Sequence, residues 1–485
     1  MKNMPTLETI LSIIQTLNPY ADQNYYSLDD VGFSHLFSDT FKNYARFCPT
    51  ANRYYTYNGT VWKLDERDTE TAELCKTFVK AFFCYSQDQS SEYSRSVSKL
   101  NSFSRRKNIL QDARGENQIT MSEFDSHPEL LNCRNVVLNL ETLEAQNHDP
   151  NLLFTKCANV VYDPDARSPD WEQFMEQVME GDREKIRYLQ KLSGYCLTAD
   201  TSEEEMFILY GSTTRNGKST FLETLAYMMG DSDSGYACAM SPDTIALKTR
   251  DSSAPSSDIA RLRGCHFLRC SEPPRSMIFN VALLKSMLGR DTLTARNLNE
   301  REFQFIPQFK IVMNTNHLPA VNDQTLFSSG RVKVITFDRH FSDEEQDKDL
   351  RNRLERPESL SGILNWCLEG LRMYRKEGLQ EPDSVRNATQ EYRKESDKMV
   401  LFFDDCLEEK SGTNLSGKSV YGRYIEWCQK NGYRAEKKGN FFQELRRRGL
   451  LSDSGTVSGH TERNVLCNYD FALEPVDDTE NPFYS

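Results

Sequence analysis

The sequence predicts an α/β protein with a parallel β-sheet at its centre. Residues 207–209 form an apolar run that is too short for most helices, which suits a buried parallel strand. A loop of small residues follows and ends in Gly217-Lys218-Ser219-Thr220, after which apolar residues recur at helical spacing up to Met229. A strand, such a loop and a helix in this order predict a phosphate-binding site at the end of the sheet.

The chemistry of this loop favours ATP and Mg²⁺ as ligands. Backbone N–H groups and a helix N-terminus converge where a polyphosphate can lie, Lys218 can reach its β and γ phosphates, and the Ser219 hydroxyl can ligate Mg²⁺. The usual pattern has glycine six residues before the lysine, whereas here Ser212 stands there and Gly211 lies one residue further out. A chance match of a small-residue loop before a helix is the alternative. The residues predicted to bind nucleotide are Ser212, Thr213, Thr214, Arg215, Asn216, Gly217, Lys218, Ser219 and Thr220.

Length and composition predict a globular protein of several domains. With 485 residues, the chain has room for roughly three domains of about 150 residues each. No apolar stretch approaches the roughly 20 residues that span a bilayer, so we expect no membrane association and no signal peptide. The 13 cysteines include no CxxC pair, which favours free thiols in a reducing cytoplasm. The net charge of −13 argues against non-specific coating of nucleic acid, although it allows local basic contacts.

The first 165 residues carry helical and strand patterns but no catalytic constellation. Asn58-Gly59, between two aromatic-rich runs, predicts a hairpin from Asn52 to Leu64 with a two-residue type I′ turn. Its tyrosines could stack on single-stranded bases, although a packed sheet face is the commoner role. The polar stretch from Ser86 to Ser104 predicts an exposed loop or frayed helix, and the basic triplet at 105–107 predicts a solvated surface.

Strand-like patterns at Val136 to Leu140 and at Cys157 to Tyr162 precede a proline-containing turn near residue 165. Apolar residues then recur at helical spacing from Trp171 to Met179 and from Ile186 to Leu192. We expect these two helices to pack beneath the nucleotide-binding core, so that their apolar stripes are interior and not a binding site.

Two later strands supply candidate catalytic residues. The segment from Arg263 to Pro273 predicts a strand ending in Glu272, where a carboxylate can polarise an attacking water. Ser271 stands where many such enzymes place a metal-binding aspartate, so the metal is expected to be held through water or mainly by Ser219 and the phosphates. Ser219 and Glu272 are the candidate metal residues. The strand from Phe309 to His317 ends in asparagines, and the Asn314 amide can contact the γ-phosphate or hold the water.

Two other features complete this region. Alternating apolar residues on either side of a polar tip at 299–302 predict a β-hairpin with a charged tip. Further on, Gly330 to Ile335 places the Arg331 guanidinium directly before another predicted strand.

These segments resemble the superfamily 3 helicases, in particular a phage and plasmid branch similar to the poxvirus D-type primase-helicases. The resemblance rests on YGSTTRNGKSTFL, RLRGCHFLRCSEP, GRDTLTARNLNEREFQFIPQFKIVMNTNHLP and LFSSGRVKVITFDRHF, in that order. An upstream module, LNCRNVVLNLETLEAQNHDP followed by VVYDPDARSPDW, also matches. The resemblance implies an AAA+-like P-loop ATPase core in a homohexameric ring that translocates on single-stranded DNA, typically 3′ to 5′.

The resemblance also assigns roles to individual residues. It implies phosphate binding by Lys218 and Ser219, water activation by Glu272, sensing by Asn314, and an arginine finger acting on the neighbouring subunit from Arg331. It implies a DNA-gripping hairpin around Arg296, Asn299 and Arg301, although the family's usual lysine is absent from this tip. Larger relatives carry a primase domain with paired aspartates ahead of the helicase. The first 165 residues show no such pattern, so we expect a helicase without a primase domain and with a separate primase or other replication proteins as partners.

The C-terminal part predicts a linker helix and a winged-helix DNA-binding domain. Val385 to Met399 is a polar helix, apolar residues from Val420 to Leu445 fit two further helices, and Leu450 to Phe471 fits a two-stranded wing. A basic cluster on or beside the second helix predicts DNA contact, although basic residues at a helix end can also interact with its own carbonyls. The cluster consists of Lys437, Lys438, Arg446, Arg447 and Arg448.

The sequence thus predicts an accessory N-terminal domain at 1–165, a helicase domain at 166–380, and the linker and winged helix at 381–485. The favoured function is an ATP-dependent DNA helicase that acts on single-stranded and forked DNA in a phage, plasmid or mobile element, in the bacterial host cytoplasm. An ATP-gated origin-binding or helicase-loading initiator without unwinding activity is the alternative. A small-substrate kinase is a third, less favoured reading because of the hairpin, the asparagines and the arginine.

Overall fold

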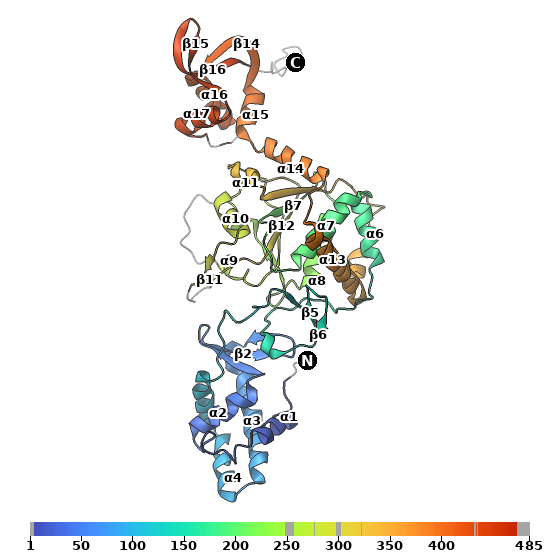
Figure 1. The fold of residues 1–485 in the computed structure, drawn as a ribbon, viewed down its shortest axis with the longest axis vertical. Coiled ribbons are helices and arrows are strands. Elements are labelled where there is room, and N and C mark those ends of the chain that lie inside the picture. Colours follow the sequence, from blue (N-terminus) through green and yellow to red (C-terminus); the bar gives the residue numbers. More distant parts are fainter. Residues whose placement is uncertain are drawn as a thin grey trace, which may run out of the picture. The chain divides into compact units, whose positions relative to one another are not determined.

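The computed structural model describes residues 4–247, 257–275, 277–296, 302–321, 323–430, 433 and 435–472. The chain divides into two compact units (Figure 1). The first comprises Met1–Pro319 and Ser328–Ala388, and the second comprises Ala320–Phe327 and Thr389–Ser485. Among the residues described, no helix has the length and apolar character needed to cross a membrane.

A five-stranded parallel sheet forms the centre of the first unit. Its strand order is β13 (Val332–Thr336), β7 (Met206–Tyr210), β12 (Lys310–Thr315), β9 (Phe267–Ser271) and β8 (Ala237–Met240). The predicted buried strand at 207–209 is confirmed, since these side chains are fully buried in β7. Because all five strands are parallel, the residues that follow β7, β9 and β12 emerge at the same edge of the sheet.

Helices cover one face of this sheet in a continuous hydrophobic cluster that includes Phe207 and Leu209. The two predicted helices are confirmed as α6 (Pro169–Val178) and α7 (Arg183–Cys196), and each begins at a capping side chain, Ser168 or Asp182. The other helices in this cluster are α8 (Lys218–Met229), α12 (Leu350–Leu354) and α13 (Pro357–Glu377), whereas α9 (Ser257–Ala260) and α10 (Val281–Leu288) lie elsewhere in the unit (Figure 1).

Glycine allows α7 and α13 to cross at close range. A Cβ atom at Gly194 of α7 would lie 2.2 Å from the backbone nitrogen of Leu371, and one at Gly370 of α13 would lie 1.9 Å from the Gln190 carbonyl oxygen. The Gln190 amide spans the same crossing and donates to the Trp366 carbonyl oxygen at 3.0 Å. The two helices are therefore packed backbone against backbone, with no space for a side chain at either glycine.

The N-terminal part of the first unit combines a helical cluster with two small antiparallel sheets. The helices are α1 (Leu7–Leu17), α2 (Asp30–Phe41), α3 (Thr69–Gln87), α4 (Ser91–Ser98) and α5 (Phe103–Asp112). One sheet contains β1 (Ala45–Cys48), β2 (Arg53–Tyr57) and β3 (Trp62–Leu64), and the other β4 (Leu130–Asn132), β5 (Val137–Asn139) and β6 (Ala145–Gln146). Leu131, Leu138 and Leu140 from the second sheet share the hydrophobic cluster of α6, α7 and α13. The domain boundary at residue 165 therefore stays a prediction.

The hairpin at Asn52 to Leu64 is confirmed as β2 and β3, but its predicted type I′ turn is wrong. Tyr57 pairs with Trp62, which leaves a four-residue loop. The Asn58 side chain accepts hydrogen bonds from the backbone of Thr60 and Val61, so a side-chain-capped turn replaces the two-residue one. Tyr54, Tyr55 and Tyr57 are buried, which confirms the packed sheet face and leaves no ring available for base stacking.

Two other local predictions need correction. The stretch from Ser86 to Ser104 is mostly helical, which agrees with the helix alternative, but it is not exposed throughout, because Ser90 caps α4 and three apolar side chains, Tyr93, Val97 and Leu100, are buried. The segment from Cys157 to Tyr162 is not a strand. Its first three backbone N–H groups donate to carbonyl oxygens of three separate segments, at Ser234, Asn132 and Met228, so no single ladder forms.

The described part of the second unit combines helices with an antiparallel sheet. The helices are α11 (Thr325–Ser328), whose first residues belong to this unit, α15 (Lys398–Cys406), α16 (Gly417–Lys430) and α17 (Lys438–Arg447). The predicted polar linker helix is present as α14 (Asp383–Glu395) and runs across the division between the units. The sheet order is β14 (Leu407–Ser416), β16 (His460–Phe471) and β15 (Leu451–Val457). The predicted two-stranded wing thus gains β14 as a third strand.

Gly194→Ala should lower the free energy of unfolding by about 1–3 kcal/mol, because the added methyl group meets backbone atoms of α13. Gly422→Ala is the matched control, since Gly422 is also helical but has open space around it. That control should gain about 0.5–1 kcal/mol from helix propensity. Urea unfolding followed by circular dichroism measures both. Equal stability of the two variants would refute the close crossing.

Candidate functional site

The predicted phosphate loop connects the carboxyl end of β7 to α8. Gly217, at the end of the loop, has φ 84°, and a Cβ atom there would lie 2.4 Å from Val178 Cγ1. At Gly211 an added Cβ would lie 2.2 Å from Asn216 Nδ2 and 2.9 Å from Lys218 Nζ. Both ends of the loop therefore require glycine. The usual pattern has its first glycine at position 212, whereas here Gly211 is the residue whose backbone packs closely against Asn216 and Lys218.

Lys218 lies inside the loop and is only 4% exposed. Its ammonium donates hydrogen bonds to the Gly211 carbonyl oxygen at 3.2 Å, to Asn216 Oδ1 at 2.9 Å and to Asn316 Oδ1 at 2.7 Å. Burial lowers the pKa of Lys218 to about 8, and the negative charge of Glu272 partly opposes this shift. The ammonium thus joins the loop after β7 to the segment after β12.

The ends of β9 and β12 bring the other predicted residues to this edge. Ser271 and Asn314 are partners in the parallel register, and the Glu272 backbone N–H donates to the Asn314 carbonyl oxygen at 3.1 Å. The Asn314 side chain is buried, and its amide nitrogen donates to Ser219 Oγ at 3.2 Å. Glu272 is exposed and adopts φ 50°, a left-handed conformation that turns the chain away from the strand.

A segment after β13 lies against the outer side of the loop. A ring nitrogen of His340 is 2.9 Å from the Thr214 carbonyl oxygen, and the Phe341 backbone N–H donates to the Arg215 carbonyl oxygen at 2.9 Å. Arg215 has φ 58° and forms an ion pair with Asp343. Side chains at 212–215 are exposed, Thr220 is half-buried, and Asn216 is buried beside Lys218.

Arg331 lies at the opposite edge of the sheet from the phosphate loop. Its carbonyl oxygen accepts from the backbone N–H of Met206, the first residue of β7, whereas the loop follows the last residue of that strand. Its guanidinium pairs with Glu204 at 2.5 Å and donates to the Lys285 carbonyl oxygen at 2.8 Å. Asp338, which follows β13, pairs with Lys185 at 3.1 Å.

The structure describes part of the hairpin that was predicted to contact DNA. The hairpin is confirmed as β10 (Leu293–Ala295) paired with β11 (Phe303–Phe305), and Arg296 is half-buried at the end of β10. Asn299 and Arg301 lie outside the described residues.

The C-terminal basic cluster is partly neutralised by neighbouring carboxylates. Arg447 and Arg448 both pair with Glu444, and Arg448 also pairs with Asp397 at 2.8 Å. Arg446 pairs with Asp453 at 3.3 Å. Lys437 and Lys438 are exposed at the start of α17, and Lys438 Nζ lies 5.8 Å from the centre of the Phe442 ring. Exposed ion pairs are worth little, so Arg446 and Arg447 can exchange their partners for phosphate, whereas the half-buried Arg448 has a structural role.

The residues at the sheet edge fit a nucleoside polyphosphate with a divalent cation. Lys218 supplies a buried charge, the first turn of α8 has backbone N–H groups without intrahelical acceptors, and Ser219 is exposed beside them. Asn314 Oδ1 is buried and has no hydrogen-bond partner among the described residues. No cluster of three metal-ligating side chains is found in the part of the chain described, so a cation here would depend on Ser219, on Glu272 and on phosphate oxygens.

Sequence reasoning missed the roles of Asn216 and Asn316 as acceptors for Lys218. The signal for Asn316 was present, because its strand ends in Asn314-Thr315-Asn316 and side chains alternate along a strand. The contacts of His340 and Asp343 join residues more than 120 positions apart in the chain and carry no local signal.

Three family models match this chain. A model described as D5 N terminal like matches residues 34–180, and one described as Poxvirus D5 protein-like matches residues 394–457. A third, a family of unknown function, matches residues 209–331, which contain the phosphate loop and the two following strands of the site.

Two curated relatives are viral proteins. A "Putative helicase" of Acanthamoeba polyphaga mimivirus is 28% identical over 64% of this chain and 34% of its own length. A "Putative primase" of African swine fever virus is 22% identical over 70% of this chain and 37% of its own length. The chain thus spans about a third of the length of these relatives. Neither is a phage protein, so the expected phage origin and bacterial host stay predictions, as does the expected lack of a primase domain.

One solved structure that the chain matches is described as the NrS-1 C-terminal region. It superposes with a TM-score of 0.47 and 11% identity over 87% of this chain and 95% of that chain.

The Lys218 ammonium should titrate near pH 8, because burial disfavours its charged form. Glu272→Gln should lower this pKa further, since the variant removes a negative charge that stabilises the ammonium. Nuclear magnetic resonance of reductively ¹³C-methylated lysines measures the titration, and Lys218→Arg assigns the signal by its disappearance. A pKa that is unchanged in Glu272→Gln would show that the carboxylate does not act on the loop.

Proposed function

Because the family models and the viral relatives support a D5-type primase-helicase-like family, we propose that this chain is an ATP-driven DNA helicase for the replication of a virus or related mobile element. One observation carries the proposal. A buried lysine, an exposed serine hydroxyl, a buried asparagine amide and a carboxylate meet where three parallel strands end. This is the set of groups that binds and hydrolyses a nucleoside triphosphate.

Each group has a distinct role in this proposal. Lys218 and the backbone N–H groups of α8 bind the β and γ phosphates, and Ser219 ligates Mg²⁺, which neutralises charge on the phosphates. Glu272 accepts a proton from the attacking water, and its exposed position beside the loop leaves room for that water. Asn314 and Asn316 report the state of the phosphates, because they bind Ser219 and Lys218 directly.

The location of Arg331 favours a ring as the active assembly. β7 has five residues and rises about 3.3 Å per residue, so Arg331 lies on the order of 15 Å from the loop of its own subunit. A guanidinium at that distance cannot touch the γ-phosphate of the same chain. In a homohexamer on single-stranded DNA it would act on the nucleotide of the neighbouring subunit, and Glu204 would hold it until assembly.

Lys218→Ala should abolish ATP binding, whereas Glu272→Gln should bind ATP and lose hydrolysis, because only Lys218 contacts phosphate in the ground state. Binding of a fluorescent ATP analogue and phosphate release measure the two effects. Displacement of a labelled strand from a forked DNA then separates a helicase from an ATP-gated initiator, which would hydrolyse ATP without unwinding. Normal hydrolysis by Glu272→Gln would place the catalytic carboxylate elsewhere.

Arg331→Ala should bind ATP nearly normally and hydrolyse it on the order of 10³ to 10⁵ times more slowly, because an arginine finger stabilises charge that develops in the transition state. Mixing it with Lys218→Ala should restore part of the activity, since some interfaces combine an intact loop with an intact arginine.

Arg290→Ala is the matched control. Arg290 is an exposed arginine that lies 3.9 Å from Asp200, and its loss should leave hydrolysis unchanged. A mixture of Arg331→Ala and Lys218→Ala that is no more active than the two variants measured separately would contradict action between subunits.

A further inference from the structure

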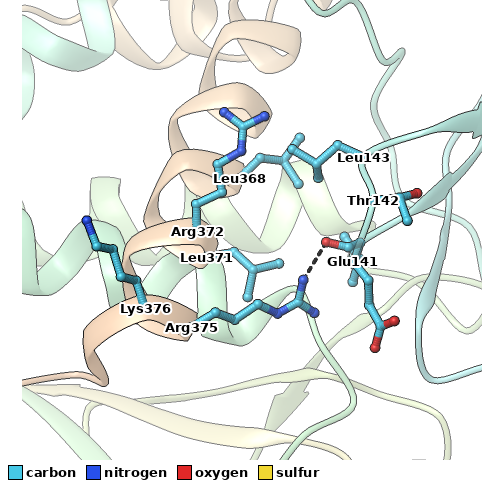
Figure 2. Close-up of a pocket in the computed structure, with 9 residues that line it drawn as sticks. Glu141, Thr142, Leu143, Leu368, Leu371, Arg372, Arg375 and Lys376 are labelled. Atoms are coloured by element: carbon cyan, nitrogen blue, oxygen red, sulfur yellow. Dashed lines mark hydrogen bonds between the residues drawn. The ribbon is translucent and has the colours of Figure 1, made fainter.

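A cavity of about 370 Å³ lies between the C-terminal half of α13 and the turn that joins β5 to β6 (Figure 2). It contains none of the residues of the proposed ATP site. Three leucines, Leu140, Leu368 and Leu371, form its floor and are almost fully buried in the hydrophobic cluster of the first unit. Leu143 completes the apolar lining and faces Leu368 in Figure 2.

Leu143 is an unusual residue for its backbone conformation. It has φ 60°, the left-handed region, which costs a residue other than glycine about 1–2 kcal/mol. Its N–H donates to the Asn139 carbonyl oxygen at 2.8 Å in the turn between β5 and β6, a position where glycine or asparagine is favoured. The turn therefore tolerates backbone strain to present a leucine side chain to this cavity.

Basic side chains form the rim. Arg375 is fixed across the cavity, because its guanidinium donates to the Leu140 carbonyl oxygen at 2.6 Å. Arg372 has one weak partner, Glu369, at 3.2 Å, and both side chains are more than half exposed. Lys376 forms no ion pair with any residue in the described part of the chain. Glu141 is the acidic residue among those that line the cavity.

We propose that this cavity docks a short acidic peptide segment of a partner protein, with an aliphatic or aromatic side chain on the leucine floor and carboxylates on Arg372, Arg375 and Lys376. The leucines favour a hydrophobic anchor, which is the usual central contact of a peptide in a pocket. The three cations complement carboxylates, and arginine binds them through two parallel hydrogen bonds. Single-stranded nucleic acid fits less well, because no aromatic residue among the nine that line the cavity offers a stacking platform.

Panning a random peptide phage library on the full-length chain tests the proposal. The enriched peptides should place Asp or Glu beside Leu or Phe, and a fluorescein-labelled synthetic copy should bind the chain in solution. Replacing both Arg372 and Lys376 by Glu should weaken binding of this peptide at least tenfold, which corresponds to about 1.4 kcal/mol. Lys107→Glu, an exposed lysine on α5, is the charge control and should bind the peptide normally.

Leu143→Gly separates docking from folding. Glycine suits φ 60°, so this variant should fold normally in circular dichroism and unfold at a temperature no more than a few degrees below that of the native chain. Its affinity for the peptide should nevertheless fall at least tenfold, because the anchor loses its contact.

Four outcomes would overturn the proposal. They are enriched peptides without acidic residues, peptide binding that survives reversal of the charges at 372 and 376, competition for the cavity by oligothymidylate, and a change of oligomeric state in the charge-reversed variant without peptide. The last two would assign the surface to nucleic acid or to a second copy of the chain. None of these measurements depends on ATP hydrolysis, so the outcome is independent of the function proposed above.

Discussion

The buried ammonium of Lys218 is the interaction on which the architecture of the sheet edge depends. An isolated charge in a protein interior is costly, and its cost is offset when every donor finds an acceptor. Here the acceptors come from the loop itself and from Asn316, which lies after a different strand. The order of the strands, the glycine at 211 and the placement of β12 beside β7 are all required for this one group to be satisfied.

The same interaction explains why the site is assembled from distant parts of the chain. β7 and β12 are neighbours in the sheet although about 100 residues separate them in sequence, so the bond from Lys218 to Asn316 forms only when the sheet has formed. The Asn314 contact with Ser219 repeats this arrangement two residues earlier in the chain. These two bonds connect the loop to β12, and the register of β12 with β9 extends the connection to Glu272. Parallel pairing of β7, β12 and β9 keeps Lys218, Asn314 and Glu272 at one edge of the sheet.

Local patterns predicted the elements of this region because their signals are short-range. The strand at 207–209, the helix from Lys218 and the strand end at Glu272 each depend on periodicity or composition within about 15 residues. The predicted turn type at Asn58 was wrong because the Asn58 side chain accepts hydrogen bonds that would otherwise come from backbone pairing. The exposure predicted for the stretch from Ser86 to Ser104 was wrong because three apolar side chains, Tyr93, Val97 and Leu100, are buried in spite of its polar composition. The pairing of Arg331 with Glu204 could not be predicted, since the two residues are 127 positions apart and only the fold brings them together.

The ion pair of Arg331 with Glu204 lies at the edge of the sheet opposite the phosphate loop and joins the starts of β13 and β7. Glu204 comes two residues before β7, so the carboxylate that pairs with the arginine and the predicted phosphate loop lie at opposite ends of the same strand. The second acceptor of Arg331 is a carbonyl of α10, the helix that leads into the hairpin formed by β10 and β11. Arg331 thus connects three elements: β13, which it directly precedes, β7, through Glu204, and α10, through Lys285. A displacement of any one of these elements must therefore move the Arg331 side chain or break its bond to Glu204 or to the Lys285 carbonyl oxygen, since both bonds are charge-assisted and short.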